Sequence, residues 1–240
     1  MSFLFISDLH LSQERPQINE LFLAFLRHTA PQAEKLYILG DLFEVWLGDD
    51  MILPDYQPAL EQMAATVNAG TAIRVMYGNR DFLMRGEFEK LTGAQIIHEP
   101  CVIDLYGTRT LLLHGDTLCT DDVEYQKFRA MVRDPQWQDA LLSKSPEERL
   151  ELARKYREIS KTETAQKDNA IMDVNQETVE GVMRENSVYN LIHGHTHRPA
   201  THHFEIDNRP ATRIVLPDWH DKGGYLLVSE NGYETREISP

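Results

Sequence analysis

Residues 3–10 read FLFISDLH, a short apolar run that ends on two side chains able to bind metal, and this arrangement returns four times. The later runs are LYILGD at 36–41, IRVMYGNRD at 73–81, TLLLHGD at 110–116 and YNLIHGHTH at 189–197. In the first third of the chain, such runs alternate with amphipathic stretches at 19–29 and 56–69, a pattern typical of βαβ units and a parallel sheet. Because ligands bind at the carboxyl edge of such sheets, the five strand ends predict one shared site.

After Gly93 the pattern changes to shorter strands with turn signals. The segment 101–114 contains the turn YGT, and two further hairpins are predicted to turn at Asp207-Asn208 and at Asn231-Gly232, which indicates a second, more antiparallel sheet. Between them, residues 121–186 are polar and helical in pattern, so we expect one α/β domain over 1–240 with 121–186 as an inserted group of helices.

Composition excludes several classes of protein. The formal charge of −14 at pH 7 opposes nucleic acid as a partner. No apolar run approaches the roughly 20 residues that a membrane-spanning helix needs. The N-terminal FLFI lacks the basic flank and cleavage site of a signal peptide, so a cytoplasmic protein is expected. Cys101 and Cys119 have no metal-type spacing and are expected to be reduced.

The strand ends together offer four imidazoles, two carboxylates and one amide oxygen. The seven candidate metal ligands are His10, His114, His195, His197, Asp8, Asp41 and Asn79. Asp8 and His10 are two residues apart, so on an extended backbone both point to one side, and the same holds for His195 and His197. Seven ligands are too many for one ion and suit two, and the mixed nitrogen and oxygen set favours Mn²⁺, Fe²⁺ or Zn²⁺. Two such ions support phosphoester hydrolysis without a covalent intermediate.

The motifs D-x-H at Asp8, G-D at Gly40, G-N-x-D at Gly78, H-G-D at His114 and G-H-T-H at Gly194 resemble the signature of the calcineurin-like metallophosphoesterases. The resemblance implies an α/β/β/α fold of two packed mixed sheets flanked by helices. It also implies one ion held by Asp8, His10 and His197, a second held by Asn79, His114 and His195, and Asp41 as the bridge. Gly78, Gly115 and Gly194 are expected to place the ligands through turns or close backbone approach.

Arg80 departs from the usual G-N-H-[DE] of this family, whose histidine is thought to assist the leaving group. Arginine does not release its proton, but it can hold phosphate oxygens with two hydrogen bonds. A phosphate leaving group is a stable anion that needs charge neutralisation more than a proton. Arg80 therefore favours a pyrophosphate substrate, and we assign catalytic roles to Arg80, Asn79 and Asp41. The alternative is a surface ion pair of Arg80 with Asp81 or Glu87.

The segments FISDLHLS, GDLFEVWLGDD and GNRD, with the large insertion, resemble the UDP-2,3-diacylglucosamine pyrophosphohydrolases of lipid A biosynthesis over the whole chain. This resemblance implies Mn²⁺-dependent attack of water on the α-phosphorus of UDP-2,3-diacylglucosamine, releasing UMP and 2,3-diacylglucosamine 1-phosphate, known as lipid X. It also implies a peripheral protein on the cytoplasmic face of the bacterial inner membrane. A monomer is expected.

The insertion is the expected substrate-binding cap. Residues 127–167 contain ten basic and seven acidic residues, a local excess of positive charge that suits an anionic substrate or membrane. Ser160, Thr164 and Lys167 share one face if they lie on a helix. The family resemblance implies that these three bind the nucleotide-sugar part with Asn79, Arg80, Asp122 and His195. Apolar residues of the insertion could line an acyl-chain groove or simply pack the helices on the body.

Two further alternatives stay open. Another metallophosphoesterase, such as a nuclease, a nucleotide pyrophosphatase, a cyclic-nucleotide phosphodiesterase or a protein phosphatase, would keep the metal ligands and change the groove. An inactive scaffold would keep the fold and lose the ligands, and the presence of all seven argues against it.

Overall fold

Three apolar runs form the parallel centre of the first sheet: β1 (Phe3–Ile6), β2 (Lys35–Leu39) and β3 (Ala72–Met76). The computed structural model describes residues 2–166 and 171–239, with side chains for 2–159 and 171–239. β4 (Gln95–Ile97) pairs in parallel with β3, and β10 (Gly223–Ser229) pairs antiparallel with both β1 and β11 (Gly232–Ile238). The order of this six-stranded sheet is β11-β10-β1-β2-β3-β4.

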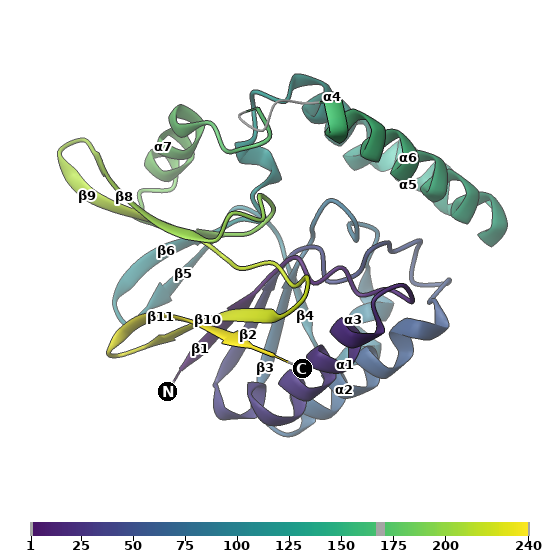
Figure 1. The fold of residues 1–240 in the computed structure, drawn as a ribbon, viewed down its shortest axis with the longest axis horizontal. Coiled ribbons are helices and arrows are strands. Elements are labelled where there is room, and N and C mark those ends of the chain that lie inside the picture. The colour runs from purple at the N-terminus through teal and green to yellow at the C-terminus, as the bar shows by residue number, and fades with distance from the viewer. Residues whose placement is uncertain (1, 167–170, 240) are drawn as a thin grey trace.

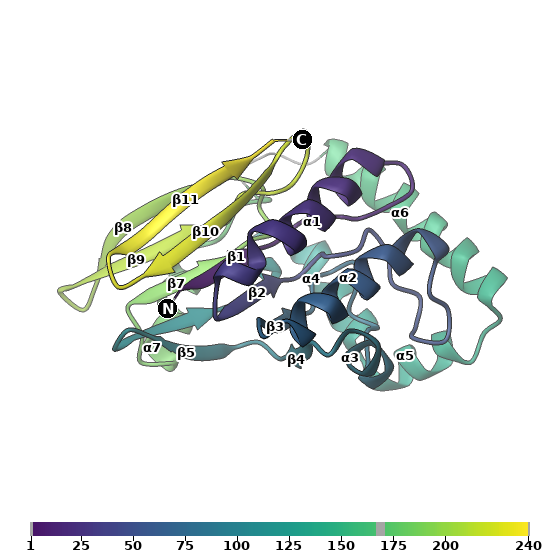
Figure 2. The ribbon, with the colours of Figure 1, turned by 90° about the horizontal axis from the view of Figure 1, so that it is seen from below.

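Helices α1 (Pro16–His28), α2 (Gln57–Asn68) and α3 (Gly86–Thr92) cover the outer face of this sheet (Figures 1 and 2). Short 3-10 turns lie at Ala30–Gln32 and Pro54–Tyr56. α1 begins before the predicted residue 19 because Pro16 suits the first turn of a helix, while α2 agrees with the predicted 56–69 within one residue at each end.

The second sheet has the order β5-β6-β7-β9-β8 and packs against the first. Its strands are β5 (Cys101–Leu105), β6 (Thr108–Leu112), β7 (Asn190–His193), β8 (Ala200–Ile206) and β9 (Arg209–Val215). β6, β7 and β9 run parallel, whereas β5 and β8 pair antiparallel at the edges. Alternate residues of the strands, such as Phe5, Leu39 and Ile192, fill the space between the two sheets. The predicted fold of two mixed sheets flanked by helices is confirmed.

Two of the predicted hairpins were placed correctly and one was not. Asp207 and Asn208 both have positive φ and join β8 to β9, as predicted. The hairpin of β10 and β11 belongs to the first sheet instead of the second, because β10 finds its partner in β1. Its turn is also shifted by one residue, since Gly232, with φ 113°, already pairs with Ser229.

The predicted insertion over 121–186 divides into two parts (Figure 1). α4 (Val123–Arg133), α5 (Pro135–Leu142) and α6 (Pro146–Gln166) form a layer over the loops that follow β1, β2 and β3, and we call these three helices the cap. α7 (Gln176–Glu185) instead packs on the outer face of the second sheet, where Val179 and Met183 belong to one apolar cluster with Leu111 and Leu191. No helix within the described ranges is both long enough and apolar enough to span a membrane.

Candidate metal centre

The loops after five strands meet at one edge of the two sheets, where backbone hydrogen bonds join them. Asp8 N donates to Gly40 O at 3.1 Å and His10 N to Asp41 O at 2.9 Å, so the first two loops are held together. His195 N donates to the Asp8 carboxylate at 2.9 Å, although the two residues are 187 positions apart. The site therefore requires both sheets.

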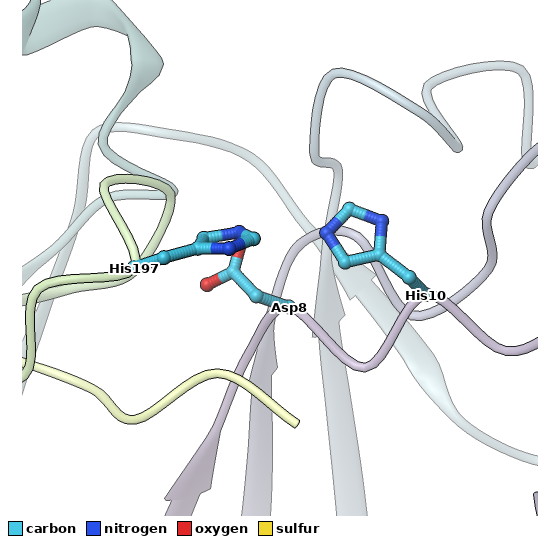
Figure 3. Close-up of side chains that lie close together, drawn as sticks. All are labelled: Asp8, His10 and His197. Carbon is cyan, nitrogen blue, oxygen red and sulfur yellow. The ribbon is translucent and has the colours of Figure 1, made fainter. Parts of the chain in front are cut away.

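One group of candidate ligands consists of Asp8, His10 and His197, whose side chains point toward one another (Figure 3). One ligand atom from each lies within 4.8 Å of the other two. His197 Nε2 is 3.5 Å from Asp8 Oδ1. Spacing on this scale suits three atoms that surround a single cation.

A second group surrounds Asp41. Ligand atoms of Asp8, Asp41 and His114 also lie within 4.8 Å of one another. Asn79 Oδ1 is 3.0 Å from His114 Nε2 and 3.1 Å from His195 Nδ1, so the amide joins the two imidazoles. Asp41 faces both groups, with Oδ2 3.7 Å from His10 Nε2 and Oδ1 3.9 Å from His114 Nε2. All seven candidate ligands thus meet at one place.

The backbone brings these ligands together differently from the sequence prediction. Asp8, His10, Asp41, His195 and His197 have φ between 49° and 68°, in the left-handed region, and not on extended backbone as predicted. Residues other than glycine seldom adopt this conformation, and it concentrates at functional sites where the surrounding structure enforces it. The two ligands of each pair, Asp8 with His10 and His195 with His197, therefore point to the same site because they lie in turns.

Two glycines make room for the carboxylates. A Cβ on Gly78 would lie 2.0 Å from Asp41 Oδ1, and a Cβ on Gly194 would lie 2.2 Å from Asp8 Oδ2. Contacts this short do not occur between real atoms, so only glycine fits at either position. This confirms close backbone approach for two of the predicted glycines, while Gly115, with φ 124°, serves as a turn residue.

The chemistry of the donor set fits divalent cations. Asp8 Oδ1 and both ring nitrogens of His10 are buried without a hydrogen-bond partner among the described residues. Burial and the neighbouring His114 lower the pKa of His195 to about 4, so its imidazole is neutral and able to bind metal. Burial opposes protonation of His114, but the carboxylates of Asp41 and other neighbours raise its pKa to about 9. A cation bound to the same carboxylates would replace that proton.

A family model described as calcineurin-like phosphoesterase matches residues 1–199. The chain belongs to this family. It is 50% identical over 235 residues to a "UDP-2,3-diacylglucosamine hydrolase" of Marinobacter nauticus, covering 96% of this chain and 95% of the relative. A Stenotrophomonas maltophilia protein of the same name is 45% identical over 246 residues, covering 100% and 99%. An archaeal phosphodiesterase of known structure is similar over 99% of both chains, with 14% identity and a TM-score of 0.48. Membership implies divalent metal ions as cofactors.

Asp81 and Asp116 belong to the family motifs but were given no role from sequence. The buried carboxylate of Asp81 accepts hydrogen bonds from Gly78 N at 2.8 Å and Leu42 N at 2.7 Å, so it joins the second and third motif loops. Asp116 accepts from Tyr125 Oη and Arg129 Nε of α4, both at 2.8 Å. Motif membership was the available signal for both residues.

Three further acidic residues, none of them part of the five metal motifs, stand beside the histidines of this phosphoesterase. Glu99 accepts a hydrogen bond from His114 N at 3.1 Å. Asp218 lies 3.5 Å from His197 Nδ1, and Glu44 lies 3.2 Å from His10 Nδ1. A carboxylate on the outer nitrogen of a metal-binding imidazole commonly fixes its tautomer and orientation.

The residues assigned to substrate lie in three different situations. Arg80 N donates to Asp41 Oδ1 at 2.9 Å, and the Arg80 Nε atom is buried without a hydrogen-bond partner. Among the described ion pairs none joins Arg80 to Asp81 or Glu87, so the surface-pair alternative finds no support. Asp122 caps α4 by accepting from Tyr125 N at 3.1 Å. The side chains of Ser160 and Thr164, and the whole of Lys167, lie outside the described residues.

Proposed function

We propose that this chain hydrolyses the pyrophosphate bond of UDP-2,3-diacylglucosamine, releasing UMP and 2,3-diacylglucosamine 1-phosphate in lipid A biosynthesis. The observation that carries the proposal is the convergence of the seven candidate ligands, with Asp41 between the two groups and Arg80 bonded to its carboxylate through the backbone N–H. The near full-length identity to relatives named UDP-2,3-diacylglucosamine hydrolase supports the choice of substrate.

The ligand groups suit two divalent ions, for which we propose Mn²⁺. Asp8, His10 and His197 would hold one, Asn79, His114 and His195 the other, and Asp41 would bridge them. When bound, such ions lower the pKa of water and neutralise charge on a phosphoryl group. His114 is ready for this role, because its Nδ1 lies 2.9 Å from Leu39 O and leaves Nε2 to the centre.

Arg80 and Asn79 are proposed to handle the two phosphates. With its Nε unpartnered, the Arg80 guanidinium can bind phosphate oxygens in a bidentate manner and neutralise the leaving lipid phosphate. Attack on the α-phosphorus would leave the new oxygen in UMP. His195 and Asp122 are proposed to contact the substrate, together with Ser160, Thr164 and Lys167.

We further propose that the cap binds the lipid part of the substrate and that the protein works as a monomer on the cytoplasmic face of the inner membrane. In support, Val123, Phe128, Met131 and Ile159 are exposed on α4 and α6, whereas other apolar residues of the insertion, such as Leu141, pack on the body. Large exposed side chains gathered on two helices are typical of a surface that meets a lipid or a partner.

The decisive experiment measures UMP release from UDP-2,3-diacylglucosamine with chelator and after addition of Mn²⁺. Asp41→Asn should abolish release, whereas Asp104→Asn should not, because in the described part of the chain Asp104 accepts from Gly107 N in an exposed turn, on a strand remote from the candidate ligands. In ¹⁸O water the label is expected in UMP. Faster hydrolysis of a simple phosphodiester than of the pyrophosphate would indicate another metallophosphoesterase. No hydrolysis either with chelator or with added Mn²⁺ would indicate an inactive scaffold.

A further inference from the structure

Glu44 stands between a candidate metal ligand and the cap. It follows the second motif, and its backbone N donates to Leu11 O at 3.1 Å, which ties this segment to the first motif loop. Its carboxylate is largely buried, with 14% of the side chain exposed. One oxygen, Oε2, lies 3.2 Å from His10 Nδ1. The opposite ring nitrogen, His10 Nε2, faces Asp41.

The other oxygen of Glu44 contacts the cap. Oε1 lies 3.2 Å from Nε of Arg157, which α6 contributes 113 positions later in the chain. Arg157 also reaches Glu14, whose Oε2 lies 3.2 Å from Nη2. A continuous series of contacts therefore runs from His10 through Glu44 to α6.

The contacts are close, yet they are not aligned hydrogen bonds. His10 Nδ1 and Arg157 Nε are both buried and lack a hydrogen-bond partner of good geometry in the described residues. Because the His10 ring and Arg157 share the Glu44 carboxylate, an interaction that fixes the orientation of the ring also affects the contact of Glu44 with the arginine.

The second ligand group has a related arrangement, in which the carboxylate contacts the backbone of the ligand residue instead of its ring. Glu99 accepts from His114 N at 3.1 Å, and its other oxygen lies 2.6 Å from Nη2 of Arg129 on α4. On both sides of the centre, a carboxylate next to a candidate ligand histidine is thus paired with an arginine of the cap. Because the arrangement occurs twice, we infer that these two pairs connect the cap to the candidate metal centre as well as to the body of the protein.

We propose that Glu44 is a positioning residue that orients His10 and, through Arg157, couples metal occupancy to the docking of α6. The inference rests on the metal centre proposed above. When a cation fixes His10, Glu44 is fixed as well and holds Arg157 more firmly. By reciprocity, a docked α6 raises the affinity for metal.

The test is Mn²⁺ affinity, measured calorimetrically on substrate-free protein. Glu44→Gln should raise the Kd about 10- to 100-fold, the usual effect of losing a partner behind a metal ligand. Glu14→Gln is the matched control, because Glu14 pairs with the same arginine and has no contact with a candidate ligand in the described structure. Its Kd should change less than about twofold.

The coupling requires a second variant. Arg157→Met removes the cap partner of Glu44, together with the Glu14 pair that the control variant tests, and should weaken Mn²⁺ binding severalfold. The double variant with Glu44→Gln should bind no more weakly than Glu44→Gln alone. Hydrogen exchange of α6 amides over 146–159 should slow on Mn²⁺ addition in the parent and not in Glu44→Gln. A merely structural ion pair would leave the metal Kd unchanged.

Each outcome decides the proposal. If the parent binds Mn²⁺ and Glu44→Gln binds it equally well, the role of Glu44 is refuted while the proposed function stands. If the parent binds no Mn²⁺, the proposed Mn²⁺ centre fails and the coupling fails with it, while UMP release decides the proposed function separately. Should Glu44→Gln lose its fold by circular dichroism, Arg157→Met decides, because unchanged metal affinity in that variant refutes the coupling.

Discussion

Gly78→Ala offers the sharpest prediction, because the added atom has a known position. The new Cβ would lie 2.0 Å from Asp41 Oδ1 and 2.2 Å from Asp41 N. Real contacts of this kind begin near 3.0 Å, so the carboxylate and its backbone must move by about an ångström. A displacement of that size at a reacting centre costs about 10²-fold in rate. Overpacking costs a further 1–3 kcal/mol of folding stability, about 2–12 °C in Tm for a chain of this length.

Gly181→Ala makes the same chemical change where space is free. No heavy atom lies within 4 Å of a Cβ built there, and Gly181 is inside α7. Because alanine favours a helix interior over glycine, this variant should keep full activity and gain roughly 0.5–1 kcal/mol. The assays are UMP release, Mn²⁺ affinity and thermal unfolding. If Gly78→Ala keeps half of the parent's activity with unchanged metal affinity, the close-approach argument is wrong.

Three further predictions concern other parts of the molecule. Arg80→Ala should lose far more activity on the pyrophosphate than on a simple phosphodiester, and equal losses would contradict the leaving-group argument. Arg149→Met should lower stability by about 2–4 kcal/mol in urea unfolding, because its buried guanidinium bonds to Asp50 and three backbone carbonyls. The hydrogen bond from Arg149 lowers the pKa of Asp50 from 3.8, so this contribution is present above that pH and is lost as the pH falls through the lower folded value. The difference in the free energy of unfolding between the parent and Arg149→Met should therefore become smaller below pH 4, by under ~1 kcal/mol. Burial raises the pKa of Cys119 to about 12, so at pH 8 a thiol reagent should label it only as fast as the protein unfolds, well after half-buried Cys101.

The sequence predicted the position of the centre because its signals are local. Each ligand follows an apolar run, and parallel strands bring their carboxyl ends to one edge whatever the details of pairing. The partner of β10 could not be predicted in the same way. Its alternation of apolar residues fits either sheet, and only the pairing of Leu226 with Phe5 across 221 positions decides the matter.

The backbone of the ligands and the residues behind them were also beyond the sequence pattern. Left-handed φ at Asp8 and Asp41 results from hydrogen bonds between different loops, which no spacing rule contains. Glu99 and Asp218 lie outside the quoted segments, and Glu44 follows the second motif but faces His10 of another loop, so the contacts of all three follow from tertiary packing. Asp81 could have been recognised as a residue that joins loops, since it ends a motif and its carboxylate can accept from backbone N–H groups of the loops.

The pairing of the first strand with a late one determines when this protein can become active during synthesis. Trp219 N donates to Asp8 O, and His195 N holds the Asp8 carboxylate. His195 lies 187 positions after Asp8, so at ~5–20 residues per second a ribosome needs about 10–40 s to reach it. During that time Asp8, His10 and Asp41 are already part of the chain, but the strands that bring the other ligands to them have not all been made. The candidate ligands therefore cannot all meet until the chain has been made through His195 and β7 has joined the second sheet.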